Sequence, residues 1–128
     1  MLNRITVMGR LTKDPELRYT RGETPVASFS VACERDFKDS DGNRATDFID
    51  CVAWRGTGEF VHKYFYKGDM IAVSGRLQLR DWTDDKGVKR RNAEIAVDGA
   101  YFAGAKRDAD VSITPALTEL DDDGELPF

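Results

Sequence analysis

Residues 46–68, TDFIDCVAWRGTGEFVHKYFYKG, pass from one hydrophobic period to another without a break. In the first part, Ile49, Cys51 and Ala53 are spaced two apart, which is the period of a β-strand with one buried face. In the second part, apolar and aromatic residues are spaced three and four apart and stop before Gly68, which predicts a short helix that ends near this glycine. The stretch therefore predicts a strand that leads directly into a helix.

Alternating segments flank this stretch on both sides. They are residues 5–11, 26–33, 71–79 and 93–97. Asp41-Gly42 and the sequence DDKG supply turns between neighbouring strands. Gly9 and Gly75 lie inside two strands, at positions that favour a sharp bend or a close approach of two backbones. The order of three strands, one short helix and two strands predicts an all-β fold: a small, closed, five-stranded barrel of the OB type, with the helix between the third and fourth strands.

The length and composition are those of a single soluble domain. The chain has 128 residues and no run of about 18 apolar residues, and its start, MLNRITVMGR, lacks the layout of a secretory signal. We therefore expect a cytoplasmic protein. Cys33 and Cys51 form no Cys-x-x-Cys pair, so we expect two reduced thiols and neither a disulfide framework nor a zinc site.

Charge is distributed unevenly along the chain. Residues 108–128 contain seven acidic residues and no basic one, whereas residues 1–107 hold all 19 basic and the other 16 acidic residues. The net charge of −4 thus divides into a body of +3 and a tail of −7, which is typical of a basic body with an acidic interaction tail, or of a solubilising tail. We expect a folded domain over 1–104, a short flexible linker over 105–120 and a disordered acidic peptide over 121–128.

The last three residues favour the interaction tail. A purely solubilising tail gains nothing from Leu126 and Phe128. Pro127 stiffens the chain and presents Phe128 together with the terminal carboxylate, a combination suited to an apolar pocket rimmed by Lys or Arg on a partner protein. The predicted docking residues are Asp121, Asp122, Asp123, Glu125, Leu126, Pro127 and Phe128.

Groups suited to catalysis are scarce. His62 is the one histidine of the sequence and lies beside Lys63 on the predicted helix, where an exposed surface position is expected. Asp84 and Asp85 fall in a turn, and the GTG at 56–58 lacks the strand, helix and further glycine of a phosphate-binding loop. We expect no catalytic residue, no metal ligand and no cofactor.

The strand faces opposite the predicted core carry large aromatic residues. Period-two geometry places Phe48 and Trp54 on the outer face of their strand. In the long strand after the helix, the same geometry places Trp82 in line with Arg76 and Arg80. Aromatic side chains interleaved with cations suit single-stranded nucleic acid, because unpaired bases stack on rings and phosphates bind Lys and Arg.

Further candidates follow with less support from the pattern. Phe37 has the parity of the core face of residues 27–33, so only a hairpin that extends beyond the barrel would expose it. Arg55 is favoured because it follows Trp54. The other selected basic candidates are Arg10, Arg18 and Arg35. Further basic residues that could accompany the aromatic side chains, but are not selected, are Arg4, Lys13, Arg21, Lys89, Arg90 and Arg91.

At this point the sequence resembles the single-stranded DNA-binding proteins of bacteria and phages. The resemblance runs through nearly the whole chain, and its most specific parts are GRLTKDPELRY at 9–19, the spacing of Phe48 and Trp54, and the Pro-Phe end after acidic residues. It implies an OB-fold subunit of a homotetramer that wraps single-stranded DNA without sequence preference. It also implies a cytoplasmic, nucleoid-associated protein of DNA replication, recombination and repair.

The resemblance assigns individual residues as well. It implies that bases stack on Phe37, Phe48, Trp54 and Trp82, and that the acidic C-terminal peptide recruits replication, recombination and repair proteins. Phe37 and Phe48 stand where many members of the family have Trp, and the linker is shorter than the long linkers of many members. These departures bear on stacking strength and binding mode.

Two other functions are compatible with the residues. An RNA-binding OB-fold protein or translation factor would share the aromatic and basic faces, but it needs no Pro-Phe end. A metal-dependent nuclease would use acidic clusters, and it would cleave DNA in the presence of Mg²⁺.

Overall fold

A computed structural model describes residues 1–104 of the chain. The predicted linker, 105–120, and the predicted docking residues of 121–128 lie outside the described residues. The elements are β1 (Ile5–Leu11), β2 (Glu16–Tyr19), β3 (Pro25–Glu34), β4 (Thr46–Trp54), α1 (Arg55–Tyr64), β5 (Met70–Thr83) and β6 (Lys89–Phe102).

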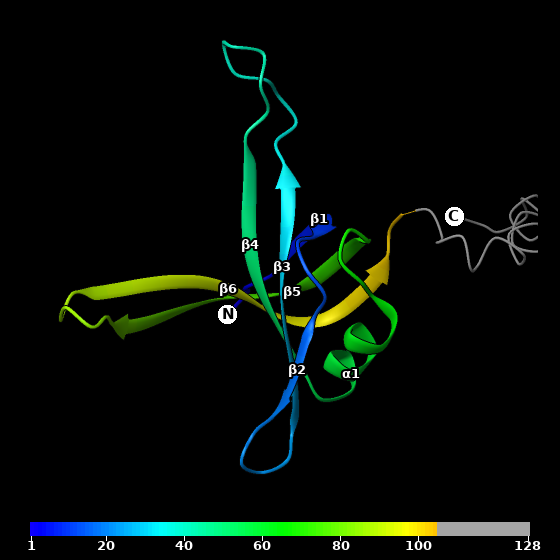
Figure 1. The fold of residues 1–128 in the computed structure, drawn as a ribbon, viewed down its shortest axis with the longest axis vertical. Coiled ribbons are helices and arrows are strands. Elements are labelled where there is room, and N and C mark those ends of the chain that lie inside the picture. Colours follow the sequence, from blue (N-terminus) through cyan, green and yellow to red (C-terminus); the bar gives the residue numbers. More distant parts are fainter. Residues whose placement is uncertain (105–128) are drawn as a thin grey trace, which may run out of the picture.

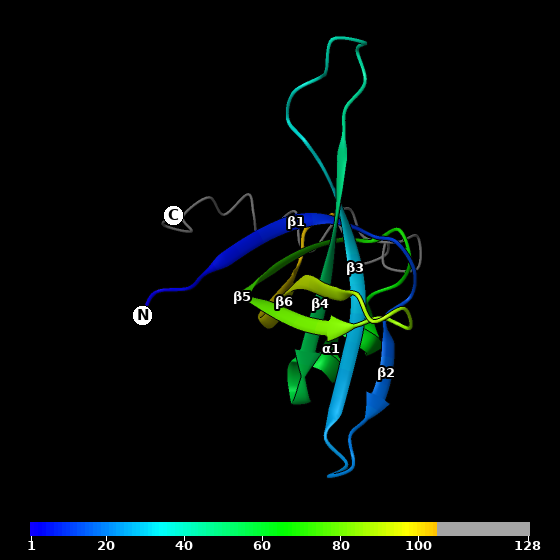
Figure 2. The same ribbon diagram turned by 90° about the vertical axis from the view of Figure 1, so that its left-hand side faces the viewer.

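Five of the strands close into a ring, which can be followed in Figures 1 and 2. The sheet order is β1-β5-β6-β4-β3-β2, and β1 also pairs with β3. That last pairing, Arg10 with Ala32 and Leu11 with Val31, joins the two ends of the series β1-β5-β6-β4-β3. The five strands of the ring are the five that the alternation predicts, and α1 lies between β4 and β5, so the OB-type fold is confirmed.

The sixth strand, β2, was not predicted. It pairs with the first part of β3, from Glu16 opposite Ser28 to Tyr19 opposite Pro25, so β2 and β1 share one edge of β3. Four residues are too few to show a periodic pattern, and Leu17 alone packs against the core from this strand. The strand nevertheless matters for the site, because it holds Arg18 on the outer face.

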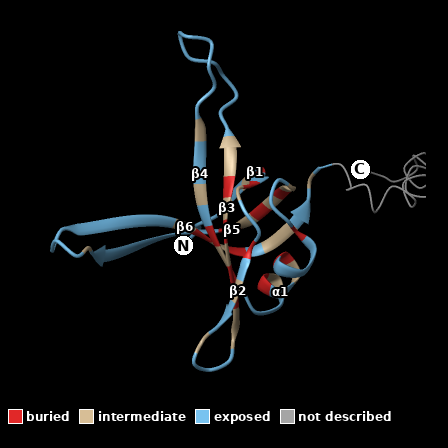
Figure 3. Cartoon of the chain, in the orientation of Figure 1, coloured by how far each residue is buried: buried red, intermediate tan, exposed pale blue. Residues whose placement is uncertain are grey.

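The core consists of the inward residues of the ring and two residues at the helix (Figure 3). Its buried members are Leu11, Ala27, Phe29, Val31, Cys51, Ala53, Val61, Phe65, Ile71, Val73, Ile95 and Val97. Leu77, Leu79 and Ala93 continue the inward parity of β5 and β6 but are exposed, because both strands run beyond the barrel. The alternation therefore predicted the strands correctly without showing where the core ends.

The helix α1 covers β3 and β4 and ends earlier than predicted. Its last residue is Tyr64, and Phe65 is already extended although its backbone N–H still donates to Val61. Gly68 lies in the following turn with φ +88°. Its conformational freedom therefore serves that turn and not the end of the helix.

Gly9 and Gly75, which are interpreted from the sequence as bends of the barrel, mark close approaches of neighbouring backbones. A Cβ on Gly9 would overlap the carbonyl oxygen of Ala32, at the β1–β3 closure. A Cβ on Gly75 would overlap the carbonyl oxygen of Ala96, next to a register shift in the β5–β6 pair. Glycine is needed at both positions because a side chain would push bonded strands apart.

The two cysteines are free thiols, as predicted. Cys51 lies in the core, and burial raises the pKa of its thiol to about 12. Cys33 is half-buried, and its Sγ lies 3.3 Å from the carbonyl oxygen of Met8.

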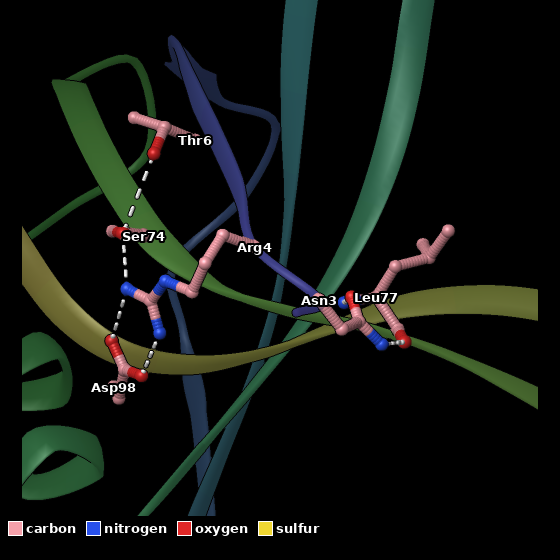
Figure 4. A network of polar contacts seen from close by, with 6 residues as sticks. All are labelled: Asn3, Arg4, Thr6, Ser74, Leu77 and Asp98. Atoms are coloured by element: carbon pink, nitrogen blue, oxygen red, sulfur yellow. Dashed lines mark hydrogen bonds and ion pairs between the residues drawn. The ribbon is translucent and has the colours of Figure 1, made fainter. Parts of the chain in front are cut away.

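A polar network ties the start of the chain to the barrel (Figure 4). Arg4 donates to Asp98 at 2.6 Å and to the hydroxyl of Ser74 at 2.7 Å, and this hydroxyl also lies 3.4 Å from that of Thr6. The side-chain amide of Asn3 bonds both the N–H and the C=O of Leu77. Arg4 is thus engaged in holding β1, β5 and β6 together.

Candidate nucleic-acid interface

The outer face of the sheet is continuous from β2 to β5. Partner residues in neighbouring strands project to the same side, so the strand registers define rows across this face. One row contains Glu16, Ser28, Val52, Ala96 and Arg76. The next contains Ser30, Asp50, Glu94 and Gln78.

Phe48 and Trp54 stand on this outer face, as their parity predicts, and are 69% and 49% exposed. Each shares its row with an arginine two strands away, about 10 Å across the sheet. Arg18 and Trp54 lie on either side of Val26, and Arg10 and Phe48 on either side of Ala32. Both arginines were candidates from sequence, and the register brings each of them into line with an aromatic ring.

The β3–β4 and β5–β6 hairpins extend from the barrel as arms (Figure 1). We call residues 33–48 the β3–β4 arm and residues 77–94 the β5–β6 arm. Phe37 belongs to the first arm and is 68% exposed. Its parity predicted a core position unless the hairpin extends beyond the barrel. The hairpin does extend beyond the barrel before Phe37, and Phe37 is therefore exposed.

Trp82 lies on the β5–β6 arm and is 44% exposed. Alternate residues of β5 share a face, and the register confirms that Arg76, Arg80 and Trp82 lie on the same side of the arm. Arg90 stands directly opposite Trp82 in this register. Arg90 was named from the sequence among the further basic residues but was not selected; its position opposite Trp82 depends on the length of the turn between the strands.

A shallow groove joins the barrel face to the base of the β5–β6 arm. It brings Arg18 of β2 and Arg80 of β5 to the same depression, although the two are far apart in sequence. Its other lining residues are Lys13, Glu16, Ser28, Phe29, Ser30, Asp50, Cys51, Val52 and Glu94.

Two of the residues that line the groove, Asp50 and Glu94, are carboxylates. Asp50 and Glu94 are partners in the parallel β4–β6 pair, and neither forms an ion pair with a described residue. Two like charges on adjacent strands repel each other and any phosphate that approaches them. Asp50 and Glu94 therefore disfavour binding of the phosphate backbone, whereas Arg18 and Arg80 in the same groove favour it.

The candidate arginines differ in how far they are already engaged. Arg35 forms two hydrogen bonds with Asp47, of 3.0 and 3.1 Å, and these hold the pKa of Asp47 below its ordinary value. Arg10 donates to the carbonyl oxygen of Gly68 at 3.0 Å. Arg18, Arg55, Arg76 and Arg80 are the candidates that form neither an ion pair nor a side-chain hydrogen bond with a described residue.

Arg55 occupies the corner between β4 and α1 with φ +56°. A positive φ is uncommon outside glycine and costs on the order of 1 kcal/mol or more. This corner lets Trp54 remain on the strand face while the chain turns into the helix. Arg55 therefore lies next to Trp54 at the point where β4 passes into α1.

Residues 1–104 contain neither a metal-binding cluster of side chains nor a membrane-spanning helix. No three His, Cys, Asp or Glu side chains in this part of the chain gather as a metal site. None of its helices has the length and apolar character needed to cross a membrane. Asp84, which the nuclease alternative would use, accepts hydrogen bonds from its own turn and from Arg90.

Comparison with known proteins identifies the family of the chain. The model of the single-strand binding protein family matches residues 2–103. A single-stranded DNA-binding protein of Oceanobacillus iheyensis is 42% identical over 106 residues, which are 83% of this chain and 66% of that protein. Single-stranded DNA-binding protein A of Bacillus subtilis is 42% identical over 83% of this chain and 62% of its own length.

The relatives differ in how much of them the match covers. Several matches span about half to two thirds of the relative, down to 49% for a protein of Lactiplantibacillus plantarum. Single-stranded DNA-binding protein 1 of Streptococcus pyogenes is 36% identical over the whole of both chains. The family match covers the strands, the helix and both arms, and the chain belongs to the single-strand binding protein family.

Proposed function

We propose that this protein binds single-stranded DNA without sequence preference and without catalysing a reaction, and that it coats exposed strands during replication, recombination and repair. The observation that carries the proposal is the set of four exposed aromatic side chains on one barrel face and two arms, with arginines between them. Bases would stack on Phe37, Phe48, Trp54 and Trp82. Stacking accepts any base, because every base has a π-face.

The distribution of charge supports an orientation for the strand. Phosphates would bind Arg18, Arg55, Arg76 and Arg80, which have no carboxylate partner among the described residues. The carboxylates of Asp50 and Glu94 would repel the phosphates. A strand on this face would therefore turn its bases toward the sheet and its phosphates toward the arginines.

Arg10 and Arg35 would contribute less than these four. Arg10 lies in the row of Phe48 but donates to Gly68, and Arg35 is held by Asp47 on the β3–β4 arm. A phosphate would have to compete with these partners, so part of the gain would be lost in breaking existing bonds.

We also propose that four chains assemble. One edge of β1 pairs with β5, whereas within the described part its other edge pairs with β3 only at Arg10 and Leu11. The remaining backbone groups of that edge are open to a strand of a second copy. Met8 and Tyr101 add exposed apolar surface to the same region.

Titration with oligo-dT tests the binding and the assembly together. Trp54 and Trp82 are the two tryptophans of the chain, so we expect stacking to quench the intrinsic fluorescence. Light scattering on the same sample should give the mass of four chains. The absence of both quenching and binding at low salt would refute DNA binding. Tighter binding of a matched RNA would favour an RNA-binding protein, and cleavage of labelled DNA with Mg²⁺ would favour a nuclease.

For the tail, we propose that residues 105–120 link the DNA-binding domain, 1–104, to a docking peptide at 121–128. The acidic residues would guide the encounter, and Phe128 with its carboxylate would anchor it. We expect deletion of Phe128 to abolish capture of replication and repair proteins and to leave oligo-dT affinity unchanged. Undiminished capture by the shortened chain would refute the anchor. A Thr118→Ala variant, changed upstream of the peptide, is the control.

A further inference from the structure

Both arms end in the same five-residue loop, at Asp39–Asn43 and at Asp84–Val88. In each loop the first residue's N–H donates to the carbonyl of the fifth, and the fourth residue's N–H donates to the carbonyl of the first. The Oδ1 of the leading aspartate accepts the N–H groups of the third and fifth residues, each at 2.9 Å. The fourth residue is glycine with φ +83° in one loop and +79° in the other.

Each loop also follows an aromatic residue at the same distance. Phe37 precedes Asp39 by two residues, and Trp82 precedes Asp84 by two. The loops are therefore equivalent supports for two of the proposed stacking side chains, and either one serves as a reference for the other.

The loop of the β5–β6 arm has one bond that the other lacks. The second carboxylate oxygen of Asp84, Oδ2, accepts a hydrogen bond of 3.1 Å from Nε of Arg90. The side chain of Asp84 is 16% exposed, whereas that of Arg90 is 56% exposed. The pKa of the Asp84 carboxyl lies below its ordinary value, chiefly because the N–H of Val88 donates to it. An ionised, largely covered carboxylate thus holds one side of an accessible guanidinium.

The strand register places Arg90 beside Trp82. The two residues are direct partners in the register, so their Cβ atoms are about 5 Å apart on one face of the arm. The bond to Asp84 occupies Nε and leaves the four N–H groups of the two terminal nitrogens without a partner among residues 1–104. These are the donors that bind a phosphate in bidentate geometry.

Arg91 provides the contrast. It bonds both oxygens of Asp81, with Nε at 2.7 Å and Nη2 at 3.4 Å. Its register partner is Asp81, so it lies on the face of the arm opposite to Trp82. Two adjacent arginines of one strand therefore differ in the face they occupy and in the donors they have free.

We propose that Arg90 binds the DNA phosphate next to the base stacked on Trp82, and that Asp84 is a positioning residue that orients the Arg90 guanidinium toward that phosphate. The inference rests on the proposed binding of single-stranded DNA and adds a specific contact to it. The ligand group is a phosphodiester, and Asp84 itself does not touch it.

The first test compares Arg90→Ala with Arg91→Ala in oligo-dT titrations at several salt concentrations. We expect Arg90→Ala to lower the affinity about three- to tenfold and to reduce the log–log salt slope by roughly 0.7 per bound protomer. Arg91→Ala should change the affinity by less than about twofold. If the wild type binds and the two variants behave alike, the assignment of Arg90 is wrong. If the wild type does not bind, the proposed function itself fails.

The second test isolates the role of Asp84. Asp84→Asn keeps an Oδ1 acceptor for the loop but removes the charged partner of Arg90, and Asp39→Asn makes the same change in the loop without an arginine. We expect Asp84→Asn to weaken oligo-dT binding about threefold and Asp39→Asn to have no measurable effect. In the Asp84→Asn background, the loss caused by Arg90→Ala should shrink. Full additivity of the two changes would overturn the positioning role.

Discussion

We expect the Trp54→Ala variant to bind oligo-dT about ten- to a hundredfold more weakly than the wild type. A base stacked on an aromatic side chain contributes about 1–3 kcal/mol, and each 1.4 kcal/mol corresponds to a factor of ten in affinity. Trp54 stands at the end of the outer face, in the row of Arg18 and next to Arg55. Its loss should therefore reduce the affinity while leaving the salt dependence nearly unchanged, because no charge is removed. Fluorescence anisotropy of a labelled oligonucleotide measures both quantities.

Tyr19→Ala is the matched control for this change. Tyr19 is an exposed aromatic residue of β2, which is separated from the Trp54 strand β4 by β3. It follows Arg18 in the strand, so it projects to the other side of the sheet. An equal loss of affinity in both variants would mean that general disturbance of the sheet, and not stacking on Trp54, causes the effect.

The second large effect concerns stability. We expect Gly75→Ala to lower the free energy of unfolding by about 3 kcal/mol, and the Tm by roughly 10–20 °C for a domain of this size. The new Cβ would overlap the carbonyl oxygen of Ala96 and lie 3.0 Å from the Cα of Val97. Both are backbone atoms of β6, so relief would require the β5–β6 pairing to move. Thermal unfolding followed by circular dichroism at constant protein concentration measures the change, since the proposed assembly would make the Tm depend on concentration.

Gly56→Ala tests whether the loss is specific to this close approach. A Cβ on Gly56 would meet no atom within 4 Å, and the residue lies in α1, where alanine favours the helix. The Tm of this variant should equal or slightly exceed that of the wild type. A wild-type Tm for Gly75→Ala would show that the strands separate at no cost and that the described packing is wrong there.

The sequence predicted the five strands of the ring and the helix because each shows its period over a short local stretch. Ile49, Cys51 and Ala53 suffice for β4, and the change of spacing at Phe60 suffices for α1. The strand β2 could not be predicted, since four residues contain no measurable period. The end of α1 was placed too late because Gly68 serves the next turn.

The candidate site was predicted in part for the same reason. Parity placed Phe48, Trp54 and Trp82 on outer faces, and the structure has all three exposed there. Parity placed Phe37 inward, because the alternation contains no information on where a strand leaves the barrel. Arg90 was only one of several further basic residues, because its partner in the register depends on how many residues the Asp84–Val88 loop contains.

The sequence by itself determined which residues alternate, which strand faces carry aromatic and basic side chains, and that the last part of the chain carries acidic residues but no basic one. These are local properties, readable within one strand or one segment. The tertiary structure decided which arginines retain free donors, which of them share a row with Phe48 and Trp54, and that Arg18 and Arg80 border one groove. These properties depend on pairing between strands that are distant in sequence. The pairing is set by closure of the barrel, which cannot be predicted from any single stretch of the chain.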